Sequence, residues 1–388
     1  MITILSKLFI KNYSDYKDTE VRRAYGMMCS ILGICLNIML FIFKYIAGYL
    51  SGAISIVADA FNNLSDAGSS LITLVGFKFA GMKADEEHPF GHGRIEYISG
   101  FIVSIIVILM GIELGKSSIS KIMHLEKVES SLITIIILII SVCTKLYMTF
   151  YNKKIGKKID SAAMKATALD SLSDSVSTIV VLLSILFMKI TNINVDGFAG
   201  CLVAIFILYT GYNAAKETLS PLLGMKPDPE LVENIKKIVL SYKEIVGIHD
   251  LIIHDYGPGR RIISLHGEVR GDGDIFELHD AIDTIENRLF DELGCEAVIH
   301  MDPIEVDNEV INKTKEEILK LIKLVDGKIT IHDFRMVQGN THTNVIFDAV
   351  IPSSFKQSDE FVKKQMEDLI KSEYKDFCPV IKIDKSYI

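Results

Sequence analysis

The sequence predicts a membrane all-α bundle of six helices followed by a cytosolic α+β domain that occurs twice. Hydrophobic residues make up 49% of the 388 residues and gather in runs of about 20 between residues 26 and 219. Residues 226–388 instead have the charged composition of a soluble domain, and one pattern of elements occurs twice in them. We therefore expect domains at residues 1–222, 226–305 and 308–388.

Each apolar run is long enough to cross a bilayer as a helix. The hydrocarbon layer is about 30 Å thick, and an α-helix rises about 1.5 Å per residue. The predicted transmembrane helices are residues 26–50, 53–80, 95–116, 130–151, 165–188 and 193–216.

Basic residues in the flanks of these runs predict the orientation of the bundle. Five lysines and arginines precede the first run and five lysines lie around the connection between the fourth and fifth runs, whereas the opposite connections contain few. Basic flanks stay on the cytosolic side. We therefore expect a multi-pass protein of the cell membrane, in contact with lipid and with both termini in the cytosol. The first 25 residues contain no cleavable apolar segment, so no removed signal peptide is expected.

The soluble part is predicted to contain two αββαβ units of the ferredoxin-like type. The tripeptide IHD at 248–250 returns at 331–333, and VIHMD at 298–302 returns as VIKID at 380–384. The turn GPGR is typical of a hairpin between the first two strands. The predicted elements are 228–242, 247–256, 260–270, 275–293 and 295–302 in copy one, and 310–325, 328–337, 342–351, 358–373 and 377–384 in copy two.

The net charge and the cysteines argue against two classes of protein. The formal net charge is −8, so no basic surface is expected that could bind nucleic acid. The six cysteines form no CxxC pair. We interpret them as small core residues and not as a disulfide framework or a zinc knuckle.

Acidic and amide side chains interrupt the second and fifth apolar runs. An isolated charge at the centre of a bilayer costs about 2.5–3.5 kcal/mol, so such residues need a partner or water. Asp59, Asn62 and Asp66 are spaced i, i+3, i+7 and share one helix face. Asp170 and Asp174 are spaced i, i+4. Two such helices can converge, which predicts an oxygen-lined cation site.

Pairing of these carboxylates with buried lysines is the alternative interpretation. Lys44 and Lys145 are the candidates, but they are few and are expected near the helix ends. We therefore favour a cation site. The role of Asp59 is left open between a residue at the entrance of the site and one that supports a ligand. Without a cation the anionic groups repel one another, so protons would replace the ion, which gives metal–proton exchange a physical basis.

Histidines outside the apolar runs indicate two further metal sites. Between the second and third runs, Asp85, His88 and His92 are three and four residues apart, and Pro89 and Gly91 prevent a regular helix there. A solvated loop without metal is the alternative. Soluble copy one contains a larger set, whose candidate ligands are His249, His266, His279, His300 and Asp302.

Copy two has fewer of these side chains. Lys382 replaces His300, and Phe347 falls opposite His266, which leaves His332 and Asp384. Copy two is therefore expected to have lost most of its metal binding and to serve packing, assembly or a regulatory contact.

Three motifs in order resemble the cation diffusion facilitator family of metal/proton antiporters. They are ADAFNNLSDAGSS in the second run, HPFGHGRIE after it and ALDSLSD in the fifth, and the resemblance extends from about Arg23 to Pro303. It implies a homodimer that works by alternating access with protons as the counter-ion. The resemblance assigns transport to Asn62, Asp66, Asp170 and Asp174, a loop site to Asp85, His88 and His92, and a site that ties dimer partners together to the five copy-one residues above.

The resemblance also bears on the transported metal. Zinc-selective members typically have a histidine where this sequence has Asp170. An all-oxygen set suits harder ions such as Mn²⁺, whereas Zn²⁺ favours imidazole and thiolate. The pattern also resembles the manganese-exporting members. We therefore expect a Mn²⁺ exporter without a catalytic cofactor, with Zn²⁺, Fe²⁺ or Co²⁺ as alternative substrates.

Two other functional classes are weaker interpretations. A metal-dependent membrane enzyme using His88 and His92 would need a catalytic base beside an open metal site, and it leaves the polar residues of two apolar runs unexplained. The chain is therefore not expected to be an enzyme. A passive channel needs a continuous wet pore, which the sequence does not indicate.

Overall fold

The chain folds into two compact units, one of residues 1–225 with 255–260 and one of residues 226–254 with 261–388. The computed structural model describes residues 2–16, 18–51, 54–123, 132–191, 195–305, 308–339, 341–352, 355 and 357–386. Within these ranges the backbone alone is described at residues 48, 50, 51, 54–59, 132–134, 185, 188, 189, 196 and 386.

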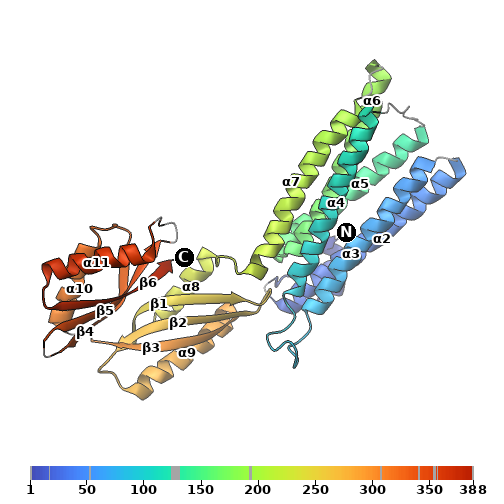
Figure 1. Cartoon of the computed structure of the whole chain (residues 1–388). Coiled ribbons are helices and arrows are strands. Elements are labelled where there is room, and N and C mark those ends of the chain that lie inside the picture. Colours follow the sequence, from blue (N-terminus) through green and yellow to red (C-terminus); the bar gives the residue numbers. More distant parts are fainter. Residues whose placement is uncertain are drawn as a thin grey trace. The chain divides into compact units, whose positions relative to one another are not determined.

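The first unit is a bundle of long helices (Figure 1). A short helix α1 (Ile2–Phe9), which lies outside the predicted apolar runs, precedes them. All six predicted apolar runs are helical where the structure describes them, apart from Val195, which caps the last helix. They form α2 (Thr19–Ser51), α3 (Ile54–Ala80), α4 (Ile95–Met123), α5 (Leu132–Lys158), α6 (Ala162–Thr191) and α7 (Asp196–Leu223).

Within the described residues, five helices are long and apolar enough to cross a membrane. The spans are Thr19–Ala47, Ile95–Met123, Ile135–Lys158, Ala162–Ser184 and Gly197–Leu223.

Helix α3 is the one predicted span that does not meet this measure. It is 27 residues long, but Asn62, Asn63 and Asp66 lower the hydropathy of its described part. Like its neighbours, α3 presents large apolar side chains on the outside of the bundle, as a lipid-facing helix does. Exposed examples on five helices are Ile42, Leu71, Leu109, Phe150 and Leu202.

Close contacts hold α6 against α3 and α4. The Oγ1 atoms of Thr73 on α3 and Thr167 on α6 are 2.8 Å apart, and both side chains are buried. On α4, a Cβ atom at Gly100 would lie 2.9 Å from the Cα of Ala163, so glycine allows the two backbones to approach. These contacts bring the polar faces of α3 and α6 together.

A buried ion pair joins three helix ends of the bundle. Arg22 of α2 donates hydrogen bonds to both carboxylate oxygens of Glu96 on α4, whose side chain is only 1% exposed. Arg22 Nε also donates to the carbonyl oxygen of Ile159, just after α5, at 2.6 Å. Both charged groups are therefore satisfied inside the protein.

The second unit contains the predicted αββαβ order twice, with element ends shifted by a few residues. Its two three-stranded sheets have the orders β1-β2-β3 and β4-β5-β6. Copy one comprises α8 (Pro229–Val239), β1 (Ile245–Asp255), β2 (Arg261–Arg270), α9 (Ile275–Leu293) and β3 (Cys295–Ile304), and copy two comprises α10 (Glu309–Ile322), β4 (Thr330–Gln338), β5 (Thr343–Pro352), α11 (Asp359–Glu373) and β6 (Phe377–Ser386).

In each copy the helices cover one face of the sheet, as Figure 1 shows for α10 and α11. The apolar cores lie between helices and sheet, with Leu265 in copy one and Phe347 in copy two among their fully buried members. Because side chains alternate along a strand, residues next to these positions lie on the opposite face. Polar side chains of β2 and β5 therefore gather away from the helices.

Strand pairing corrects the correspondence between the two copies. His266 of β2 pairs with His300 of β3, and Asp348 of β5 pairs with Lys382 of β6. Asp348, and not Phe347, therefore occupies the position of His266. The prediction of Phe347 was wrong by one residue, and in a strand this moves a side chain to the other face of the sheet.

Candidate metal centres

Three carboxylates from two helices meet inside the bundle. Asp66 of α3 and Asp170 and Asp174 of α6 each offer an oxygen, and these atoms all lie within 4.8 Å of one another. Asp66 and Asp170 are buried, and Oδ1 of Asp170 has no hydrogen-bond partner within the described residues. A cluster of buried oxygen donors of this kind can coordinate a hard cation.

Lys145 lies between two of these carboxylates. Its Nζ is 2.6 Å from Oδ2 of Asp66 and 2.7 Å from Oδ2 of Asp174, and its side chain is only 4% exposed. The expectation that the lysines lie too near the helix ends to pair is wrong for Lys145, which stands in the middle of α5. The ammonium group offsets part of the negative charge of the cluster. Sequence spacing gave no signal for this contact because Lys145 comes from a third helix.

Asn62 and Asp59 are the other two polar residues predicted on α3, and the structure describes the side chain of Asn62 alone. Asn62, one turn before Asp66, is exposed, whereas its neighbour Asn63 is buried. The side chain of Asp59 lies outside the described residues. Their roles as a ligand and as an entrance or supporting residue stay predictions.

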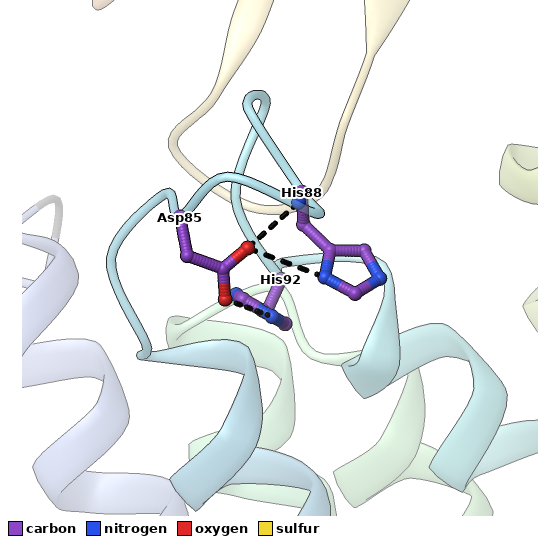
Figure 2. Close-up of side chains that lie close together, drawn as sticks. All are labelled: Asp85, His88 and His92. Carbon is purple, nitrogen blue, oxygen red and sulfur yellow. Dashed lines mark hydrogen bonds and ion pairs between the residues drawn. The ribbon is translucent and has the colours of Figure 1, made fainter.

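The loop between α3 and α4 brings Asp85, His88 and His92 together. Figure 2 shows the Asp85 carboxylate directed toward both imidazole rings: its oxygens are 3.4 Å from His88 Nδ1 and 3.4 Å from His92 Nε2. The loop can turn this tightly because Gly91 adopts a positive φ of 79°. Asp85 and His88 are exposed, whereas His92 is 9% exposed in its side chain. One carboxylate and two imidazoles form a set that suits Zn²⁺ and related ions.

Local hydrogen bonding keeps the Asp85 carboxylate ionised. The backbone N–H of His88 donates to Oδ1 of Asp85 at 2.7 Å. This bond, aided by the charges of His92 and His88, lowers the pKa of Asp85 below its ordinary value. The carboxylate is thus available as an anionic ligand at neutral pH.

Copy one of the second unit contains a third group of predicted ligands. His249 of β1, His266 of β2 and Asp302 of β3 each offer a donor atom within 4.8 Å of the others. Asp302 Oδ2 is 3.0 Å from His249 Nε2 and 2.8 Å from His266 Nδ1. Three neighbouring strands thus present their side chains to one point.

His300 and His279 lie differently. His300 pairs with Asp302 at 3.3 Å and its ring lies 4.7 Å from that of His266, but its side chain is 66% exposed. It borders the group at the surface. His279 stands on α9, 64% exposed, and pairs with Asp283 of its own helix at 3.5 Å. Because α9 covers the opposite face of the sheet, His279 is not brought to the other four residues in this chain.

Neighbouring acidic side chains raise the pKa of His249. Burial lowers its pKa, but the Glu268 carboxylate, 3.4 Å from Nδ1, and the charge of Asp302 outweigh burial and raise the pKa above its ordinary value. The same acids therefore favour the protonated imidazole, and a metal ion would compete with that proton.

Comparison with known proteins finds two family matches, one over the helical bundle and one over copy one of the second unit. Residues 30–223 match the cation efflux transmembrane domain, and residues 227–304 match the cytoplasmic domain of cation efflux proteins. Copy two lies beyond both matches.

Curated relatives cover the same part of the chain. An uncharacterised transporter of Methanocaldococcus jannaschii is 33% identical over 276 residues, which is 71% of this chain and 97% of that protein. The cation-efflux pump FieF of Klebsiella pneumoniae is 25% identical over 290 residues, 74% of this chain and 96% of the pump. FieF of Escherichia fergusonii is 27% identical over 292 residues, with 74% and 96% covered.

Proposed function

The chain belongs to the cation diffusion facilitator family of cation efflux transporters, and we propose that it exports Mn²⁺ from the cytosol in exchange for protons. One observation carries the proposal: Asp66, Asp170 and Asp174 form a cluster of carboxylates with no nitrogen or sulfur ligand in the set. Oxygen donors suit Mn²⁺, whereas Zn²⁺ favours imidazole and thiolate. Asn62 is proposed as a fourth oxygen ligand.

The charge of the cluster supports exchange of one divalent ion for protons. Three ionised carboxylates and the Lys145 ammonium leave two negative charges, which one divalent cation would neutralise. When the ion leaves, the same charges favour binding of protons, because unpaired charges are costly inside a bundle. Alternating access would expose this one site to each side of the membrane in turn.

The proposal also covers the orientation of the chain, its assembly and its other two metal sites. We propose that both termini face the cytosol and that two chains form a homodimer, since copy one matches the family's cytoplasmic domain. Light scattering of the detergent-purified protein tests the dimer, and a mass of one chain would contradict it. The loop site and the copy-one site are proposed as accessory metal sites of a transporter, not as catalytic centres.

Competition transport in everted membrane vesicles tests the metal. We expect the wild-type chain to prefer Mn²⁺ over Zn²⁺, Fe²⁺ and Co²⁺, and Asp170→His to shift the preference toward Zn²⁺ by roughly tenfold, because it adds an imidazole to an all-oxygen set. Ser173→Ala is the matched control, since Ser173 is a buried neighbour whose hydroxyl, among the described residues, donates to the Leu169 carbonyl oxygen of its own helix. Preference of the wild type for Zn²⁺ would contradict the oxygen-donor argument.

A separate transport experiment tests the counter-ion. In reconstituted proteoliposomes, an imposed pH gradient should drive Mn²⁺ movement, and collapse of the gradient with a protonophore should reduce it several-fold. Transport that is indifferent to the gradient would remove proton exchange from the proposal while leaving metal export in place.

A further inference from the structure

A fourth group of metal-binding side chains lies where the two copies of the second unit contact each other. It comprises His332 of β4, Asp348 of β5, Asp384 of β6 and, from copy one, Asp250 of β1; one donor atom of each lies within 4.8 Å of the others. His332 Nε2 is 3.7 Å from Oδ1 of Asp250 and 3.7 Å from Oδ2 of Asp384. The group joins strands that lie far apart in the sequence.

Three members of this group are structural counterparts of the copy-one ligands. Strand pairing matches Asp348 with His266, and β3 and β6 match Asp384 with Asp302. His332 corresponds to His249, since each is followed by an aspartate in the left-handed region, with φ of 52° at Asp250 and 51° at Asp333. Copy two has therefore kept the arrangement of copy one with a carboxylate in place of one imidazole. The expectation that copy two lost most of its metal binding rested on Lys382 in place of His300, which the strand pairing retains, and on Phe347 opposite His266, which it corrects to Asp348.

The His332 side chain is the observation that points to a ligand. The residue is 9% exposed, and neither ring nitrogen has a hydrogen-bond partner within the described part of the chain. Buried polar atoms without a hydrogen bond are uncommon because they lose their hydration without replacement. The ring stacks on His249 at 4.3 Å between centroids, which fixes its plane. A metal ion would satisfy the nitrogen that faces the carboxylates.

Charge in the group favours a divalent cation. Lys382 donates to Asp348 at 3.1 Å and to Asp384 at 3.3 Å, but its side chain is 63% exposed, so it can withdraw into solvent. With Lys382 in place, the three carboxylates retain two negative charges. A group of three carboxylates and one imidazole is suited to Mn²⁺, Fe²⁺ or Zn²⁺.

We infer that copy two binds a divalent transition-metal ion through Asp250, His332, Asp348 and Asp384. Because Asp250 belongs to copy one, the ion ties the two copies of one chain together. The copy-one set of His249, His266 and Asp302 lies beside it through the stacked imidazoles. The second unit thus holds a pair of metal sites, one richer in nitrogen and one richer in oxygen.

Metal counting on the full-length, detergent-purified protein tests the inference. The probe is Mn²⁺ in equilibrium dialysis, with bound metal measured by mass spectrometry and the melting temperature recorded in chelator. His332→Ala and Asp250→Asn should each bind one ion fewer per chain at a concentration that saturates the wild type, with affinity at that site reduced at least ~10-fold. Lys382→Ala should keep the number of ions and bind one of them several-fold more tightly, because it frees two carboxylates.

Asp368→Asn, an exposed carboxylate on α11, is the matched control and should bind as the wild type does. Wild-type stoichiometry and affinity in both His332→Ala and Asp250→Asn would overturn the site. Loss of the ion in His332→Ala but not in Asp250→Asn would overturn the link between copies. The readout is binding and not transport, so failure here is distinguishable from failure of the proposed export function.

Discussion

Replacing Asp174 by alanine should reduce metal efflux by roughly 100-fold or more, the largest effect expected for a single substitution in this chain. Asp174 is one of three clustered carboxylates and one of two partners of the buried Lys145. Its removal takes away an ion ligand and, within the described part of the chain, leaves Asp66 as the carboxylate that is hydrogen-bonded to the Lys145 ammonium. The ammonium should then hold Asp66 more strongly. The measurement is Mn²⁺ uptake by everted vesicles with protein abundance matched by immunoblot.

The double variant Asp174→Ala/Lys145→Ala separates two causes of this loss. If Lys145 blocks the cluster once Asp174 is gone, the double variant should recover part of the uptake. If the missing ligand dominates, it should remain inactive. Ser173→Ala again serves as the buried control on α6. Uptake by Asp174→Ala within twofold of the wild type would show that the cluster is not the transport site.

Replacing Glu96 by glutamine should destabilise the helical bundle by about 3–5 kcal/mol, because it leaves the Arg22 guanidinium without its buried counter-charge. The Glu96 side chain is 1% exposed and that of Arg22 11% exposed, so water cannot take over this role. We expect a large fall in the melting temperature of the detergent-purified protein and a lower folded yield.

Glu217→Gln is the matched control for this prediction. Glu217 on α7 pairs with Lys165 on α6 at 2.9 Å, but the two side chains are 54% and 37% exposed. Exposed pairs contribute about 0–1 kcal/mol, so little change in melting temperature is expected. Equal melting temperatures for the two variants would contradict the prediction that the buried pair contributes more to stability than the exposed pair.

Much of the fold could be predicted because its signals are local. Apolar runs of sufficient length gave the helices α2 to α7, and the recurring IHD and VIHMD patterns gave the duplicated αββαβ order. Helix α1 was missed because eight residues in a charged tail carry little periodic signal. Helix α3 was predicted as a membrane span interrupted by polar residues, and it is helical, although its described part is less apolar than its neighbours.

Candidate ligands could be predicted where sequence spacing alone brings them close. Asp170 and Asp174 are one helical turn apart, and Asp85, His88 and His92 share one short loop. Contacts between residues of separate elements were harder to predict from the sequence. Lys145 was discounted although it bonds two carboxylates, and Asp348 was assigned to the wrong face of its strand.

Hydropathy and periodicity depend on neighbouring residues, so they were enough to predict a helical membrane protein with a repeated α+β domain. Which charged side chains contact one another depends instead on the packing of distant elements. Packing of α5 against α6 inserts Lys145 among the carboxylates, and contact between the two copies adds Asp250 to the side chains of copy two. Such encounters depend on how elements pack and on strand register, and a register error of one residue reverses the face on which a side chain lies.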